Sequence, residues 1–386
     1  MVITKAYKTQ IYPSDMQKKF ILRTLGSCRF VYNHMLNRNI TIYKRRKEHM
    51  SYIDMQNLLP VMKTYFPWLK EADSQALKFA CRQLNDSYNK FFKHLGDFPK
   101  FKKKHGRQSY TTTNASAIIW NPRLVKLPCI GSVKTLDKRT LPTNAKVCRA
   151  TISLDTDGKF YVSVSFKHEV NVKTTPIEDT TTLGLDYQVK GLYIDSNGNT
   201  LIYPKWYQDS LIRLRIEQKK LSRMKGSRKG EKKSNRYLKQ QAKVSKLQHH
   251  ISQQRYDYLQ KQSTAITKQY DTICIEDLSM QDMMLRVKDT HKRKLRKAAN
   301  KAYANNGWYM FTRMLIYKED WQGGRIIKVN KYFKSTQTCS CCGYINKELK
   351  DVSIKDWICP KCGVHHNRDD NSAQNIKAEG LRLLAS

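Results

Sequence analysis

The sequence predicts an α+β protein of more than one domain, in which a helical segment interrupts a set of N-terminal strands and a mixed α/β portion follows. Three observations support this fold class. A chain of 386 residues is too long for a single compact core. Apolar residues switch along the chain between strand-like and helix-like spacing. Two closely spaced cysteine pairs then interrupt the last predicted strand-to-helix connection.

The N-terminal elements begin with a predicted strand at residues 3–12, which Pro13 ends. Apolar residues at helical spacing follow, and Ser14 or Asp15 is the expected N-cap of that helix. A second amphipathic helix is expected from Ser74, its predicted N-cap, to Leu95.

The middle of the chain changes to strand signals. Residues 148–166 contain two β-branched and aromatic runs around a Thr-Asp-Gly turn, which predicts a hairpin. The Thr-rich stretch 170–182 has no periodicity, so we expect a domain boundary there. Beyond it we expect a hairpin that turns at Asn197-Gly198, a helix through 244–265, a strand within 271–280, a basic segment at 292–303, a helix through 308–321 and a strand at 324–330.

The charge of the chain indicates a polyanionic partner. Lys and Arg number 72 against 32 Asp and Glu, a formal charge of +40. A compact chain of that charge repels itself unless a polyanion neutralises it, and nucleic acid binding of this kind weakens with salt. A membrane-surface protein is the alternative, but we find no amphipathic anchor and no apolar run of the roughly 20 residues that span a bilayer.

The cysteines indicate a metal site in a reducing compartment. The chain has ten, of which five lie within residues 339–362. The N-terminus lacks the apolar run of a secretory signal, so we expect a cytoplasmic protein of a prokaryote. The spacing C-x₂-C-x₁₆-C-x₂-C is that of a structural zinc ribbon, in which glycine after each outer cysteine permits the turn. The expected zinc ligands are Cys339, Cys342, Cys359 and Cys362.

Other assignments of the cysteine cluster remain open. Free or redox-active thiols are one alternative. Cys341 adjoins Cys342, and adjacent ligands have poor geometry, so we leave it out of the site. His365 or His366 could replace a thiolate, but four well-spaced cysteines favour surface or nucleic-acid contacts for these histidines.

Isolated acids in apolar strands indicate a second metal site. Asp186 lies in "LGLDYQV" and Glu276 follows Ile-Cys-Ile, and an unpaired carboxylate in such a strand is costly without a cation. The segment "NRDDN" supplies a third acid. Paired Mg²⁺ ions held by carboxylates cleave phosphodiesters. The alternative for each acid is a turn cap or an ion pair, which we expect for Asp277 and Asp370.

These motifs, in this order, resemble TnpB, the OrfB-type family of insertion-sequence nucleases related to type V CRISPR effectors. "KAYKTQIYPSDMQKKFILRTLGSCRFVYNHML" is similar to the family's opening. "LGLDYQVKGLYIDSNGN" and "ICIEDLSM" resemble its first two RuvC-like motifs. "STQTCSCCG", "CPKCG" and "NRDDNSAQNI" resemble its zinc ribbon and third motif. The resemblance covers nearly the whole chain.

The resemblance implies a site and its metals. Asp186, Glu276 and Asp369 would be the catalytic acids and would hold two Mg²⁺ ions, or Mn²⁺. In the third motif, Asn367 replaces the family's leading Asp and Ser372 its Ala, so Asp370 is the alternative third acid. The zinc ribbon would position Asp369.

The resemblance also implies a domain plan. Residues 1–13 and 106–180 would form a β-barrel wedge domain, and 14–105 an inserted helical recognition domain. Residues 181–338 and 366–386 would form an RNase H-like (RuvC) domain, with a zinc ribbon at 339–365.

The implied function is RNA-guided cleavage of double-stranded DNA beside a short adjacent motif, with a guide RNA from the transposon end. A compact type V CRISPR effector, a guide-directed repressor without cleavage and a strand-joining transposase are the alternatives. The transposase lacks support because the chain has no His-hydrophobic-His motif with a nucleophilic Tyr. We favour a monomer.

The basic stretch 219–246 is the predicted phosphate-binding segment. It holds twelve Lys or Arg and one acid, Glu231. A solvated basic helix is the alternative interpretation. The residues expected to bind nucleic acid are Lys219, Lys220, Arg223, Lys225, Arg228, Lys232, Lys233 and Arg236.

Overall fold

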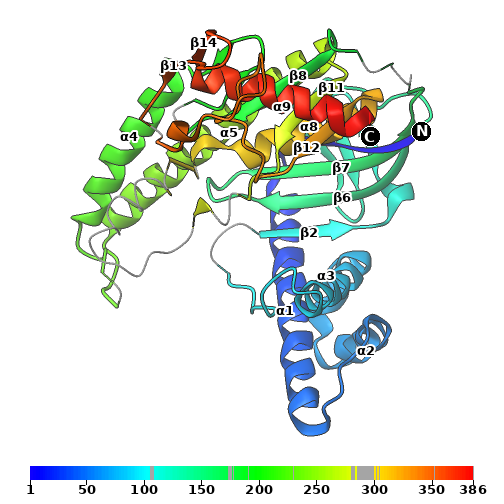
Figure 1. Cartoon of the computed structure of the whole chain (residues 1–386). Helices are drawn as coiled ribbons and strands as arrows, with labels where there is room; N and C mark the ends of the chain where they lie inside the picture. The colour runs from blue at the N-terminus through cyan, green and yellow to red at the C-terminus, as the bar shows by residue number, and fades with distance from the viewer. Residues whose placement is uncertain are drawn as a thin grey trace. The chain divides into compact units, whose positions relative to one another are not determined.

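The computed structural model divides the chain into two compact units, Met1–Val170 and Asn171–Ser386 (Figure 1). It describes residues 1–104, 108–172, 176, 178–189, 191–228, 230–279, 283–284, 300, 302–303, 305–351 and 353–385. Most of the predicted basic segment 292–303 therefore lies outside the described residues.

Among the described residues, the first unit contains a seven-stranded antiparallel sheet in the order β2-β6-β7-β1-β5-β4-β3. The predicted first strand and the predicted hairpin are confirmed, and Gly158 takes the positive φ of +81° that the hairpin turn needs. Closure into a barrel stays a prediction. The strands are β1 (Val2–Tyr12), β2 (Gln108–Thr112), β3 (Ile119–Asn121), β4 (Leu124–Leu127), β5 (Gly131–Thr135), β6 (Lys146–Leu154) and β7 (Phe160–Glu169).

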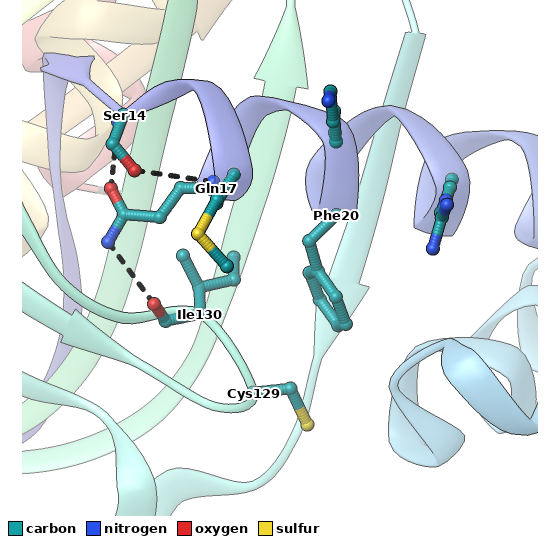
Figure 2. Close-up of a pocket in the computed structure, with 8 residues that line it drawn as sticks. Ser14, Gln17, Phe20, Cys129 and Ile130 are labelled. Atoms are coloured by element: carbon teal, nitrogen blue, oxygen red, sulfur yellow. Dashed lines mark hydrogen bonds between the residues drawn. The ribbon is translucent and has the colours of Figure 1, made fainter.

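Helices α1 (Asp15–Arg46), α2 (Tyr52–Tyr65) and α3 (Ser74–Phe92), with the short η1 (Pro67–Glu71), lie between β1 and β2 in the sequence. Ser14 caps α1, because its hydroxyl accepts the Gln17 N–H and the Gln17 side chain accepts the Ser14 N–H (Figure 2). The Gln17 amide also donates to the carbonyls of Ile130, at 3.2 Å, and Ser132, at 3.0 Å. The start of α1 is thereby fixed to the β4–β5 loop and the first residues of β5.

The predicted N-cap of α3 is wrong by one residue. Asp73 caps the helix, since its Oδ1 accepts the Gln75 N–H at 2.9 Å, and Ser74 is already helical. A carboxylate at this position gains from the positive end of the helix dipole, which a serine does not. The apolar face is correct from Leu77 to Leu84, whereas Leu95 lies beyond the helix and is 74% exposed.

The second unit is built on a five-stranded sheet, counted over the described residues, in the order β10-β9-β8-β11-β12. Strand β11 runs parallel to its neighbours β8 and β12, while β8, β9 and β10 are antiparallel neighbours. The predicted turn at Asn197-Gly198 is confirmed, with φ of +82° at Gly198. The strands are β8 (Thr182–Tyr187), β9 (Tyr193–Asp195), β10 (Thr200–Leu201), β11 (Thr272–Glu276) and β12 (Arg325–Val329).

Helices cover both faces of this sheet, as a parallel core requires. Leu185 and Ile275 pack with residues of α5 (Asn235–Gln269) and α8 (Trp308–Gln322). Their neighbours point the opposite way, so Cys274 packs against Ile376 of α9 (Arg368–Ala385). Helix α4 (Lys205–Ser222) precedes α5 and packs on it.

A small cysteine-bearing segment is inserted between β12 and α9. It contains η3 (Lys347–Lys350) and the hairpin of β13 (Asp356–Ile358) and β14 (His365–Asn367). Its core is Cys339, Leu349, Trp357 and Cys359. Separately, the helices within the described ranges include none with the length and apolarity needed to cross a membrane.

The contact of α9 with the sheet generates a stability prediction. A Cβ on Gly184 of β8 would lie 2.2 Å from the Ala373 carbonyl oxygen and 2.9 Å from the Lys377 backbone nitrogen of α9. Both are backbone atoms, so Gly184→Ala should lower the free energy of unfolding by roughly 1–3 kcal/mol. Denaturant titration measures this change.

The matched control is Gly26→Ala within α1, where a Cβ meets nothing within 4 Å. It should leave stability unchanged or raise it by up to about 1 kcal/mol. Equal stability of Gly184→Ala and the wild type would contradict the close packing of α9.

Candidate functional site

Strand alternation places two of the predicted acids on the α9 side of the sheet. Asp186 is two residues after Gly184 and Glu276 is two residues after Cys274, so each shares the face of that residue. Gly184 and Cys274 both lie against α9. A Cβ on Gly184 would meet the Ala373 carbonyl, and a Cβ on Gly380 would lie 2.2 Å from the Cys274 Sγ. Asp186 and Glu276 therefore lie near the C-terminal ends of parallel strands, on the face that α9 covers.

The third predicted acid lies in the first turn of α9. The side-chain oxygen of Asn367 accepts the N–H groups of Asp369, at 3.1 Å, and Asp370, at 3.4 Å, as an N-cap does. The asparagine at position 367 therefore acts as an N-cap for α9. The register of α9 on the sheet then determines where the Asp369 carboxylate lies.

The three carboxylates influence one another. Burial raises the pKa of Asp186 well above its usual range, and the charges of Glu276 and Asp369 raise it further. The Ser372 side chain and Arg368 oppose that shift. Burial also raises the pKa of Glu276, whose carboxylate accepts a hydrogen bond from the Ser335 hydroxyl at 2.8 Å. A divalent cation would stabilise this concentration of buried negative charge.

Asp369 has two further partners that sequence reasoning missed. The Gln188 amide donates to its Oδ2 at 3.2 Å. The Lys355 ammonium lies 3.1 Å from Oδ1 and 2.9 Å from Oδ2. Gln188 directly follows β8, two residues after Asp186, which is a signal the sequence did contain. Nothing in the sequence indicated Lys355.

The acids next to the predicted set behave differently. Asp277 forms an ion pair with Lys328 at 2.8 Å, as predicted. Burial and then the charge of Asp369 raise the pKa of Asp370. Of these two aspartates, Asp369 is the one whose charge acts on Asp186. Asp369 as the third acid, with Asp370 as the alternative, stays a prediction.

The four predicted zinc ligands come together. The Sγ atoms of Cys339, Cys342, Cys359 and Cys362 all lie within 4.8 Å of one another. Two pairs, Cys339–Cys362 and Cys342–Cys359, are 3.6 Å apart. Four thiolates at this spacing suit tetrahedral zinc and leave no open position, so the donor set fits a structural ion.

The two knuckles around these thiols have the same backbone geometry. Gly343 and Gly363 take φ of +72° and +71°. Their N–H groups donate to the carbonyls of Cys339, at 3.0 Å, and Cys359, at 2.9 Å. A residue with a Cβ would be strained at either glycine, which explains the repeated Cys-Gly pair.

The prediction that His366 is a surface or nucleic-acid contact is wrong. Strand pairing sets His366 opposite Trp357, and its ring packs on that indole at 4.9 Å. The side chain is 6% exposed, with Nε2 3.1 Å from the Cys339 Sγ. Cys339, exposed Cys341 and His366 form a second group whose ligand atoms lie within 4.8 Å. Neighbouring His365 is exposed.

The cysteine-bearing segment is anchored on α9. The Asn371 side chain donates to the Thr338 carbonyl at 2.7 Å and accepts the Ser340 N–H at 2.8 Å. The Asn375 amide donates to the Ser335 carbonyl at 2.8 Å. Because Ser335 also donates to Glu276, one chain segment connects the knuckles, α9 and the second acid.

The eight predicted nucleic-acid-binding residues are all exposed. They lie at the end of α4, in the α4–α5 connection and at the start of α5. Lys220 forms an ion pair with Glu217 at 3.2 Å, and the Lys233 ammonium lies over the Tyr237 ring at 5.5 Å. The sequence pattern alone predicted this basic surface.

Family models match residues 1–48 ("Helix-turn-helix domain"), 165–287 ("Probable transposase", OrfB_IS605) and 308–376 ("Cas12f1-like, TNB domain"). Over 1–48 the structure has a strand followed by one continuous helix. A solved Cas12f1 chain, in complex with sgRNA and target DNA, matches with a TM-score of 0.58 at 12% identity, over 97% of this chain and 99% of that one. This likeness concerns the fold.

Fold and site together define a mixed α/β protein with a four-cysteine zinc-ribbon-like insertion beside a group of acids, of which Asp186 is buried. A relative from Escherichia coli (strain K12), "Putative RNA-guided DNA endonuclease InsQ", is 30% identical over 99% of this chain and 93% of its own length. A relative from Streptomyces pristinaespiralis, "Putative RNA-guided DNA endonuclease", is 29% identical over 99% of this chain and 91% of its own length. The chain belongs to the TnpB (OrfB-type) family of insertion-sequence proteins.

The four-cysteine site generates a metal prediction. The purified chain should contain about one zinc ion, and Cys359→Ser should lose it, because a closed four-thiolate site tolerates no missing ligand. Cys341→Ser is the matched control and should retain zinc. Elemental analysis measures both, and zinc loss in Cys341→Ser with retention in Cys359→Ser would show that the ligand set is wrong.

Proposed function

We propose that this protein is an RNA-guided DNA endonuclease of an insertion sequence that cleaves target DNA by metal-dependent phosphodiester hydrolysis. The proposal is supported by the placement of Asp186 and Glu276 on the α9-covered face of two parallel strands, with Asp369 in the first turn of α9. Family membership supports it, since relatives that match almost the whole chain have names describing this activity.

Asp186, Glu276 and Asp369 would hold the catalytic Mg²⁺ or Mn²⁺ ions. Carboxylate oxygens are the hard ligands these ions prefer. Such ions supply an activated water and neutralise the charge that develops on the scissile phosphate. In the part of the chain that the structure describes, the oxygens of these three carboxylates do not all lie within 4.8 Å of one another. A pair of ions about 3.5–4 Å apart requires a wider ligand set than one ion does.

The residues of the chain itself would position these acids. The Ser335 hydroxyl orients Glu276, and the Gln188 amide orients Asp369. The Asn367 side chain fixes the first turn of α9 and with it the direction of the Asp369 carboxylate. Burial of Asp186 excludes water from one side of the acid group.

We also propose the finer domain plan of the family. The antiparallel sheet of the first unit would be a wedge barrel (1–13 and 106–180) with an inserted recognition domain (14–105). The mixed sheet with helices on both faces supports an RNase H-like nuclease domain (181–338 and 366–386) with a zinc ribbon (339–365).

The proposed partners are a guide RNA from the transposon end and double-stranded target DNA. The charge of +40 and the eight exposed basic residues support a polyanionic partner. A monomer in the cytoplasm of a prokaryote stays a prediction. The fold shared with Cas12f1 favours a compact type V CRISPR effector as the second candidate, with the same chemistry in a different genetic setting.

The test is cleavage of a matched plasmid by the protein purified with its bound RNA. EDTA should abolish cutting and Mg²⁺ should restore it. Asp186→Ala, Glu276→Ala and Asp369→Ala should each lower the cleavage rate by roughly a thousandfold or more, because each loses several kcal/mol of metal-borne stabilisation. Guided DNA binding, measured by gel shift, should survive in all three.

Two neighbouring acids provide matched controls, Asp277→Ala and Asp370→Ala, and both should still cut. If Asp370→Ala were inactive and Asp369→Ala active, the third acid would be misassigned. If all variants bound guided DNA and the wild type never cut, the protein would be a guide-directed repressor instead.

A further inference from the structure

The most unusual contact of the acid group is the ion pair between Lys355 and Asp369. The ammonium lies within hydrogen-bond distance of both carboxylate oxygens, at 3.1 and 2.9 Å. The Asp369 side chain is 27% exposed and that of Lys355 is 55% exposed. Among the described residues, no other ion pair involves Asp186, Glu276 or Asp369.

The backbone brings Lys355 to this position. Lys355 directly precedes β13, and the first pair of the β13–β14 ladder joins Asp356 to Asn367. The Arg368 N–H extends this ladder by donating to the Lys355 carbonyl at 2.7 Å. Lys355 is therefore held opposite the first residue of α9, one residue from Asp369, for as long as the hairpin is formed.

The Lys355 ammonium takes the acceptor sites that a divalent cation would need on Asp369. Both oxygens accept from Lys355, and Oδ2 also accepts from Gln188. An ordinary exposed ion pair contributes only up to about 1 kcal/mol. This pair differs because the Asp369 charge also acts on the buried Asp186 and raises the pKa of that carboxyl.

We propose that Lys355 is the resident counter-cation of Asp369, which a divalent ion must displace when it binds the acid group. This inference rests on the proposed function and names a residue that regulates its metal site. Ion binding and the Lys355 contact compete for one carboxylate, so they are negatively linked. The hairpin of the zinc ribbon would thereby set how readily the site takes up its metal.

The test measures Mn²⁺ binding to the RNA-free full-length chain by electron paramagnetic resonance and by calorimetry. Lys355→Gln removes the competing charge and should tighten Mn²⁺ binding by about threefold to tenfold. Lys355→Arg keeps a competing cation and should bind Mn²⁺ more weakly than Lys355→Gln. Zinc content reports whether each variant retains its ribbon.

The matched control is Lys328→Gln. Lys328 forms an ion pair of 2.8 Å with Asp277, next to Glu276, and its side chain is 53% exposed. The substitution removes the same charge at a pair outside the proposed ligand set, so Mn²⁺ affinity should stay as in the wild type.

Unchanged or weaker Mn²⁺ binding in zinc-loaded Lys355→Gln would overturn the proposal, and weaker binding would mean that Lys355 positions Asp369 for the ion. Equal tightening in Lys328→Gln would also overturn it, because the effect would then be net charge. Asp186→Asn tests the proposed metal site separately from the role of Lys355. If that variant binds Mn²⁺ like the wild type, the proposed metal site itself is wrong, whatever Lys355 does.

Discussion

The contact of α9 with the parallel strands is the constraint on which the rest of the second unit depends. Gly184 and Gly380 allow helix and sheet to approach until backbone and sulfur atoms occupy the space of a side chain. Close approach at two positions along α9 fixes both its rotation and its height on the sheet. The first turn of the helix, which carries Asp369, is then held beside the strand-borne acids.

The zinc-ribbon-like segment also holds α9 in place on the sheet. It leaves the sheet after β12, is fastened to α9 by Asn371 and Asn375, and returns directly into the helix through β14. A closed four-thiolate site does no chemistry itself. Its role is structural, because the fixed hairpin positions Asn367 and Lys355 at the start of α9.

Much of the second unit could be predicted from the sequence because its signals are local. Acids inside apolar strands and paired Cys-x-x-Cys-Gly knuckles each predict a metal site from only a few residues. The predicted strands, hairpin turns and buried faces follow from alternation and helical spacing. Lys355 and the burial of His366 could not be predicted, because both depend on which residues a two-stranded ladder sets opposite each other. The predicted N-cap of α3 was wrong by one residue because Asp73 and Ser74 are adjacent and both residue types are good N-caps.

We propose that Asp186, Glu276 and Asp369 form one metal-binding group. The most direct measurement is anomalous diffraction from crystals of the RNA-bound protein soaked in Mn²⁺. Anomalous peaks should lie within about 2.0–2.4 Å of carboxylate oxygens from all three residues, the range of such metal–oxygen bonds. Peaks that contact other side chains while these three carboxylates remain without an ion would contradict it.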